Sequence, residues 1–319
     1  MDLQQLNALI AISEYGSFSA AADALATVQS NVSTHVKKLE TELGMELVDR
    51  STRSLTEAGE LVVARARRVI GELDAMASDV TALTHEVVGT VRLGIIGTAA
   101  RWLVPSLIEL TPERYPLLHL VFIEATTMGL DAQLASGQVD LGVLGLPAPG
   151  TELRTTPLFE EDFVLVVPQD HALAGSALVH LEDLVALPLI LPIRGSSYRD
   201  ELDQAMTLRG LTLHPRAEVD SLRLIAALSF EGAGYAIVPS GAISPRRSEA
   251  EQWSYIPVEG LAPRLVGVAQ RRRGIPGAPV RAIFEILQEI IFNRARTPWG
   301  VRPIAPDEVA GRTWARAPS

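Results

Sequence analysis

The chain has 319 residues, a formal net charge of −10 and no cysteine, and 47% of its residues are hydrophobic. This composition is typical of a globular protein with two or three domains, and it excludes disulfide bonds and thiolate metal sites. No uncharged apolar run reaches the roughly 18 residues of a membrane span, and the acidic N-terminal segment is not typical of a secretory signal. We therefore expect a cytoplasmic protein that makes no membrane contact.

Three short helices are predicted before Gly44. Leu3 to Tyr15 favours the first, and an alanine-rich segment with Ser19 as candidate N-cap favours the second. In the third, apolar residues recur at helical spacing on one stripe: Val28, Val32, Val36, Leu39 and Leu43. Two short helices joined by a tight turn, with a polar outer face on the second, are typical of a helix-turn-helix. The following segment, "DRSTRSLTEAG", predicts a compact wing.

A long helix is predicted from about Glu57 to Glu86. Apolar residues recur along it at alternating spacings of four and three: Val62, Ala66, Val69, Leu73, Met76, Val80 and Leu83. This heptad seam favours pairing with a second copy of the chain, and packing against its own domain is the alternative.

From Thr90 onward, strand and helix patterns alternate in two successive sets. "TVRLGII", "LHLVFIEA" and "VDLGVLG" are strands of the first set, and "EEDFVLVVP", "HPRAEV" and "YAIVP" are strands of the second. The alternation predicts an α/β sheet architecture that is present twice. The last residues, rich in Pro, Gly, Arg and Ala without periodicity, predict a disordered tail.

Several of these segments together resemble a known family. "SFSAAADALATVQSNVSTHVKKLETELGMELVDR…TR…LTEAG" resembles the N-terminal signature of LysR-type transcriptional regulators. The blocks "LVPSLIELTPERYP", "LASGQVDLGVLG", "EEDFVLVVP" and "EGAGYAIVPS" follow in the family's order, so the resemblance spans about Leu3 to Ala295. The sequence departs from the family pattern at Ser30, usually Pro, and at Val48, usually Phe, and its wing is about two residues shorter.

The resemblance implies an α/β protein with an α-rich N-terminal winged helix-turn-helix, a long linker helix and a two-lobed effector domain like that of periplasmic binding proteins. The expected boundaries are 1–58 for the DNA-binding domain, 59–88 for the linker (dimerisation) helix, 89–295 for the effector domain and 296–319 for the tail. Lobe I is expected at about 89–162 and 266–295, and lobe II at about 163–265. The implied function is a ligand-responsive, sequence-specific DNA-binding regulator, dimeric or tetrameric, that senses a small anionic metabolite and is not an enzyme.

The predicted DNA-binding residues lie on the third helix and the wing: Gln29, Ser30, Ser33, Thr34, Lys37, Lys38, Arg50 and Arg53. Hydroxyl groups and lysines on one helix face can meet bases and phosphates in a major groove. The four basic residues between positions 26 and 55 are balanced by four acidic ones, so this prediction depends on where the charges point. The alternative is a solvated helix face.

The predicted effector residues lie where strands give way to helices: Thr98, Ala99, Arg101, Leu103, Thr126, Thr127, Ser196, Ser197, Tyr198, Arg199 and Ser221. Ligands of two-lobed α/β domains bind at such junctions, where helix N-termini converge. Arg101 and Arg199 are predicted to hold an anionic group. The alternative for each threonine or serine is a simple helix N-cap.

Two other protein classes fit less well. A solute-binding protein would use the α/β part, but the N-terminal domain and the missing signal peptide oppose it. An enzyme is opposed by the missing catalytic pattern, since the six histidines show no i, i+4 pair or metal-like cluster. "GAGYAI" lacks the third glycine of a dinucleotide fingerprint, and no P-loop occurs, so no cofactor is expected.

Overall fold

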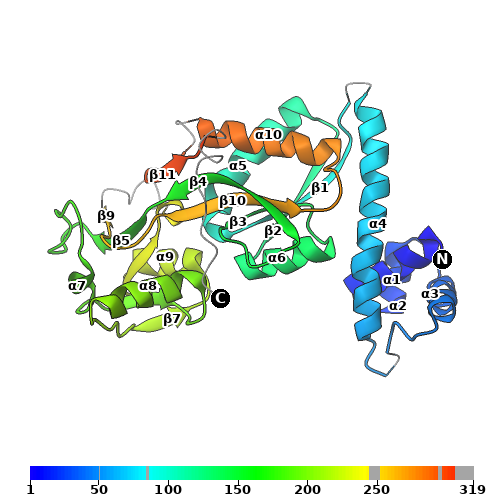
Figure 1. Cartoon of the computed structure of the whole chain (residues 1–319), viewed down its shortest axis with the longest axis horizontal. Helices are drawn as coiled ribbons and strands as arrows, with labels where there is room; N and C mark the ends of the chain where they lie inside the picture. Colours follow the sequence, from blue (N-terminus) through cyan, green and yellow to red (C-terminus); the bar gives the residue numbers. More distant parts are fainter. Residues whose placement is uncertain (50, 84–85, 244–251, 294–296, 306–319) are drawn as a thin grey trace.

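A computed structural model of the chain describes residues 1–49, 51–83, 86–243, 252–293 and 297–305. Figure 1 shows an N-terminal helical domain and a larger α/β part, with the long helix α4 (Glu57–Ala82) between them. The α/β part consists of two lobes, each built on its own sheet.

The N-terminal domain packs α1 (Leu3–Tyr15), α2 (Phe18–Ala24) and α3 (Gln29–Leu43) around one apolar core. Ser17 caps α2 by accepting a hydrogen bond from the backbone N–H of Ala20, so the prediction of Ser19 as the cap is wrong. Ser17 has the extended backbone that an N-cap needs, whereas Ser19 already lies inside the helix.

The apolar stripe of α3 is shorter than the sequence suggested. Its middle residues Val32, Val36 and Leu39 are buried in the domain core. Val28 and Leu43 are 59% and 43% exposed, because Val28 is the N-cap and Leu43 is the last helical residue, where the core no longer reaches. The wing follows as one antiparallel bridge between Val48 and Leu55.

Helix α4 leaves the N-terminal domain and passes along lobe I (Figure 1). Of the seam residues, Ala66 is buried in the N-terminal core and Val62 packs against it. The remaining five are between 37% and 81% exposed: Val69, Leu73, Met76, Val80 and Leu83. Packing within the chain therefore accounts only for the beginning of the seam. The helix also ends at Ala82, before the predicted Glu86.

Lobe I is a six-stranded sheet in the order β11-β4-β10-β3-β1-β2. Its strands are β1 (Gly89–Ile95), β2 (Leu118–Glu124), β3 (Leu141–Gly145), β4 (Leu153–Glu161), β10 (Arg264–Arg271) and β11 (Val301–Pro303). Its helices are α5 (Gly97–Arg114), α6 (Thr127–Ser136) and α10 (Ala278–Phe292). Strands β1, β2 and β3 are parallel, so their carboxyl ends meet at one edge of the sheet.

Lobe II is a five-stranded sheet in the order β7-β6-β8-β5-β9. Its strands are β5 (Phe163–Pro168), β6 (Leu189–Pro192), β7 (Ala217–Val219), β8 (Tyr235–Pro239) and β9 (Trp253–Pro257). The helices are α7 (Leu181–Leu184), α8 (Ser197–Leu208), α9 (Leu222–Phe230) and the short 3-10 helix η1 (Ser240–Ala242). Strands β6, β7 and β8 are parallel, and α8, α9 and η1 start beyond their carboxyl ends. Two mixed α/β sheets behind an N-terminal helix-turn-helix confirm the predicted fold class.

The predicted disorder of the tail is wrong for its first part. Strand β11 pairs with β4, and Val301 and Ile304 are buried. Arg302 Nη2 donates a hydrogen bond to Asp162 at 2.8 Å. Two buried apolar side chains and an ion pair thus hold a segment whose composition alone suggests no structure. Residues 306–319 lie outside the described part of the chain.

Candidate functional site

The structure presents the predicted recognition face of α3 to the outside of the N-terminal domain. Gln29, Ser30 and Thr34 are exposed and Ser33 is partly exposed. The hydroxyl of Thr34 donates to the carbonyl of Ser30 at 2.7 Å, which fixes its rotamer and leaves the oxygen lone pairs outward. Small polar groups therefore cover the part of the helix that enters a groove in helix-turn-helix proteins.

The basic and acidic side chains around α3 differ in their surroundings. Lys37 and Lys38 are exposed, and no carboxylate within the described ranges pairs with either. Three of the four acidic residues of the same region are bonded to other groups, and the fourth, Glu46, is exposed. Glu40 accepts hydrogen bonds from the backbone N–H groups of Leu47 and Val48, at 2.9 and 3.3 Å, and so fixes the start of the wing.

The carboxylates of two further residues are also bonded to other groups of the chain. Glu42 pairs with the N-terminal ammonium group. Asp49 accepts hydrogen bonds from the hydroxyl and the backbone N–H of Ser51, and these bonds lower the pKa of its carboxyl. A region with zero formal charge thus has lysines free on one face. In the wing, Arg53 is exposed, whereas Arg50 lies outside the described residues.

The second candidate site is the boundary between the carboxyl edges of the two sheets, called the interlobe cleft here. On lobe I, Arg264 at the start of β10 lies between two of the strand–helix junctions. Its Nη1 donates to Thr98 Oγ1 at 3.1 Å. A Cβ atom at Gly145 would lie 3.3 Å from Arg264 Nη2 and from Thr127 Oγ1, so glycine there leaves room for the guanidinium.

The carboxyl group of Glu161 lies beneath this arginine and is 1% exposed. It accepts hydrogen bonds from Arg264 Nη1 at 3.3 Å and from the backbone N–H of Gly241 at 3.2 Å. Burial raises the pKa of Glu161, and the nearby Arg264 and the Gly241 N–H partly offset that rise. Arg264 Nε and Nη2 have no hydrogen-bond partner among the described residues, and its side chain is 17% exposed. Arg264 therefore keeps two hydrogen-bond donors, Nε and Nη2, which lie beside Gly145.

Lobe II meets this edge through direct contacts. Arg101 of α5 donates to the carbonyl oxygens of Gly241 and Ile243, at 3.4 and 2.5 Å. Arg223 at the start of α9 pairs with Glu124 at the end of β2, at 3.2 Å. These bonds join the lobes on either side of Thr98. Arg101 therefore already serves as a bridge between lobes, and burial lowers the pKa of its guanidinium.

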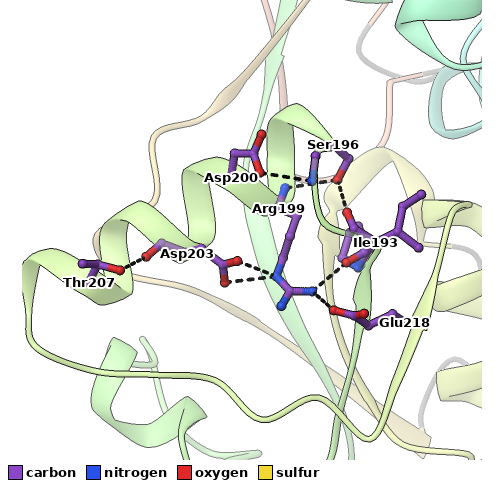
Figure 2. Close-up of polar contacts among 9 residues, drawn as sticks. Ile193, Ser196, Arg199, Asp200, Asp203, Thr207 and Glu218 are labelled. Atoms are coloured by element: carbon purple, nitrogen blue, oxygen red, sulfur yellow. Dashed lines mark hydrogen bonds and ion pairs between the residues drawn. The ribbon is translucent and has the colours of Figure 1, made fainter.

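The prediction that Arg199 holds an effector anion is wrong. Its side chain is 1% exposed and points along the inside of α8 (Figure 2). Nε donates to both carboxylate oxygens of Asp203 at 3.0 Å. Nη1 donates to Glu218 at 2.6 Å and to the carbonyl of Pro192 at 2.8 Å. Burial opposes the charge, but the hydrogen bonds to Asp203 and Glu218 raise the pKa of Arg199 above its ordinary value.

Three further predicted effector side chains are part of the core. Tyr198 is stacked on Phe163 with ring centroids 4.2 Å apart, and its hydroxyl donates to the carbonyl of Ile237. Burial raises the pKa of Tyr198 well above its ordinary value. Ala99 and Leu103 are buried on the inner face of α5. Helical spacing from Thr98 cannot show which side of α5 faces the sheet, and the structure turns these two residues inward.

The remaining junction residues are helix caps at the cleft edge. The hydroxyls of Thr126, Ser196 and Ser221 each accept a hydrogen bond from a backbone N–H at the start of their helix. Thr127 Oγ1 accepts from the N–H of Gly145 at 3.2 Å and ties α6 to β3. The side chain of Ser197 lies outside the described part of the chain. The alternative of simple capping thus holds for three of the four junctions, while Thr98 is bonded to Arg264.

The sequence matches two family models of known proteins. The family model described as "Bacterial regulatory helix-turn-helix protein, lysR family" matches residues 3–60, and the "LysR substrate binding domain" model matches residues 84–291. The chain belongs to the LysR family. It is a ligand-responsive transcriptional regulator that binds DNA through its helix-turn-helix, binds a small-molecule effector and forms oligomers; it is not an enzyme. The predicted family membership is thereby confirmed.

Named relatives share nearly the whole length. The chain is 30% identical over 297 residues to the "DNA-binding transcriptional dual regulator OxyR" of Escherichia coli K12, which covers 92% of this chain and 96% of the relative. A "probable hydrogen peroxide-inducible genes activator" of Streptomyces viridosporus is 34% identical over 244 residues, covering 76% and 78%.

Solved structures agree. Full-length OxyR from Pseudomonas aeruginosa, with a cysteine replaced by aspartate, has a TM-score of 0.73 at 26% identity, covering 93% of this chain and 96% of that one. CbnR complexed with its target DNA has a TM-score of 0.64 at 23% identity, covering 91% and 100%, which supports the fold.

Arg264 and Glu161 were missed from the sequence. They lie 166 and 63 positions from Thr98. Their strands, β4 and β10, carry other charged residues as well, so no local pattern distinguished these two. Among the described residues there is no group of three or more His, Asp or Glu side chains suited to a metal, and none of the helices there is long and apolar enough to cross a membrane.

Proposed function

We propose that this regulator senses a small anionic metabolite in the interlobe cleft, with Arg264 as the group that holds the anion. The observation that carries the proposal is that Nε and Nη2 of Arg264 have no hydrogen-bond partner among the described residues and lie beside Gly145 at the carboxyl edge of lobe I. A planar guanidinium fork matches the two oxygens of a carboxylate. Thr98 keeps the arginine in place from the opposite side.

The two lobes provide the means of response. An effector that contacts both edges of the cleft favours the closer arrangement, because only differential affinity for the two arrangements can shift their populations. Arg101 and the Arg223–Glu124 pair are contacts that such a rearrangement would alter. Helix α4 contacts both α6 and α10 and would pass the change to the DNA-binding domain.

At the DNA, we propose that α3 enters a major groove with Lys37 and Lys38 toward phosphate or guanine and the hydroxyls of Ser30, Ser33 and Thr34 toward bases or phosphates. The exposed lysines have no carboxylate partner among the described residues, and the carboxylates of Glu40, Glu42 and Asp49 are bonded elsewhere, which supports this proposal. The two modules of an oligomer bind together, which compensates for an acidic chain. The protein would act in the cytoplasm, where its DNA lies.

A peroxide response is the second candidate, since the Streptomyces relative is described as a probable hydrogen peroxide-inducible genes activator. This chain has no cysteine, so it cannot respond through oxidation of a thiol. This candidate implies a bound peroxide molecule, as in the peroxide-bound structure of a cysteine-substituted OxyR from Corynebacterium glutamicum, which has a TM-score of 0.56.

The test combines a thermal-shift screen of small carboxylic acids and hydrogen peroxide with a mobility shift on the chain's own upstream DNA. Ligand binding to the native state raises the melting temperature. We expect a carboxylate to raise it and to change DNA affinity, and Arg264→Gln to weaken both effects at least tenfold. Arg216→Gln, an exposed arginine of lobe II, is the charge-matched control. An acid response that Arg264→Gln leaves intact, or a response to peroxide alone, would refute the proposal.

A further inference from the structure

A second cluster of arginines lies away from both sites, between α4 and lobe I. A cavity of about 360 Å³ opens there between α4 and the carboxyl end of β10. Five arginines line it, Arg65, Arg68, Arg271, Arg272 and Arg273, against only two glutamates, Glu72 and Glu152. A surplus of three positive charges at one place stands out in a chain whose net charge is −10.

Two of the five arginines are occupied. Arg68 Nε donates to the carbonyl of Ala135 at 3.1 Å, and its Nη2 lies 3.2 Å from Glu152. Arg271 Nη1 donates to the carbonyl of Leu134 at 3.5 Å. Both therefore neutralise the carbonyl end of α6, where cations are favoured by the helix dipole.

The other three arginines lack such partners. No carboxylate or carbonyl among the described residues pairs with the guanidinium of Arg65, Arg272 or Arg273. Arg65 lies three positions before Arg68 on the same face of α4 and also lines the cavity. All three are exposed, so their guanidinium groups can bind an anion that enters the cavity from solvent.

Hydrogen bonds hold the end of β10 and the side of α4 that border the cavity. The N–H of Arg272 donates to the carbonyl of Glu152 at 2.8 Å, which holds the end of β10. Further along α4, Asp79 accepts hydrogen bonds from the N–H of Ala278 at 2.8 Å and from Arg281 at 3.1 Å. The cavity is thus a defined space between two docked elements.

We propose that this cavity is a binding site for a small polyanion, such as a molecule with two phosphate groups. Its volume is within the range of small-ligand pockets, about 300–1,000 Å³. Figure 1 places α3 on the far side of α4 from β10, so the cavity at the end of β10 is separate from the recognition helix. A guanidinium group can donate two parallel hydrogen bonds to one phosphate or carboxylate group, so several arginines suit a ligand that carries several such groups.

A polyanion here bridges α4 and lobe I. It contacts Arg65 on the linker helix and Arg272 and Arg273 on lobe I, and so stabilises one angle between them. Because α4 carries the DNA-binding domain, the bound anion biases the spacing of the recognition helices independently of the interlobe cleft.

The test is isothermal titration of the full-length protein with inorganic pyrophosphate in about 150 mM salt, where weak surface pairing is screened. We expect saturable binding to one site per chain. Arg272→Gln with Arg273→Gln should weaken it at least tenfold, whereas Arg209→Gln with Arg216→Gln, exposed arginines of lobe II, should not. Thermal unfolding of each variant confirms that it folds.

Two controls separate this site from the alternatives. Arg264→Gln should leave pyrophosphate binding unchanged, so a loss there would place the anion in the interlobe cleft and overturn the proposal. No saturable binding, or equal binding by the double variant, would also overturn it. A third outcome would overturn it as well: the wild type binds no pyrophosphate, and the oligomer dissociates in the double variant. The arginines would then contact a second copy of the chain.

Discussion

Replacing Arg199 with methionine separates its structural role from a role in effector binding. Arg199→Met keeps a long side chain of similar size. It removes the hydrogen bonds that the guanidinium now donates to Asp203, Glu218 and the carbonyl of Pro192. Breaking a buried ion pair costs about 3–5 kcal/mol. The side chains of Asp203 and Glu218 are 39% and 38% exposed, so water can hydrate the released carboxylates. We therefore expect a loss of about 2–3 kcal/mol in the free energy of unfolding.

Scanning calorimetry and urea unfolding measure this loss. For a folding unit of roughly 200 residues, each kcal/mol lowers the melting temperature by about 2–4 °C, which gives a fall of about 4–12 °C. The control is Arg216→Met, which removes an exposed arginine and should change stability by less than about 0.5 kcal/mol. An Arg199→Met protein with wild-type stability but no effector response would refute the structural role and return this residue to the effector site.

Three further variants test the DNA face, the seam and the buried acid. Lys37→Ala should weaken DNA binding and reduce its salt dependence in a mobility shift, and an unchanged affinity and salt slope would remove Lys37 from the interface. Leu73→Asp with Met76→Asp places carboxylates on the exposed part of the seam and should weaken self-association at least tenfold in sedimentation; an unchanged oligomer would show that these residues face water. The raised pKa of Glu161 means that the folded state binds its proton more tightly, so its contribution to stability is lost as pH rises from about 4.5 through the folded pKa. In urea unfolding, the free energy of unfolding of Glu161→Gln should therefore rise relative to that of the wild type as the pH increases through this window. A difference between the two proteins that does not vary with pH would contradict the raised pKa of Glu161.

Local patterns in the sequence determined the elements and the family. Helical spacing located α1, α3 and the long helix, and strand–helix alternation gave the two sheets, because periodicity reports which face of an element is buried. The polar face of α3 was also readable, since surface helices place polar groups outward. The signals weaken at element ends: Val28 and Leu43 continue the apolar spacing of α3, yet the domain core does not reach them.

Tertiary structure decided which polar side chains are available. Ser17 and Ser19 both suit a cap, and only the entry angle of the chain selects the first. Arg199 and Arg264 are both arginines near a strand end, but Arg199 is surrounded by two carboxylates while Arg264 keeps two free donors. Hydrogen bonds between residues as far apart as Thr98 and Arg264 depend on strand order and on which edges face each other. No local pattern encodes that arrangement, because the partner of a buried charge is chosen by the packing of distant segments.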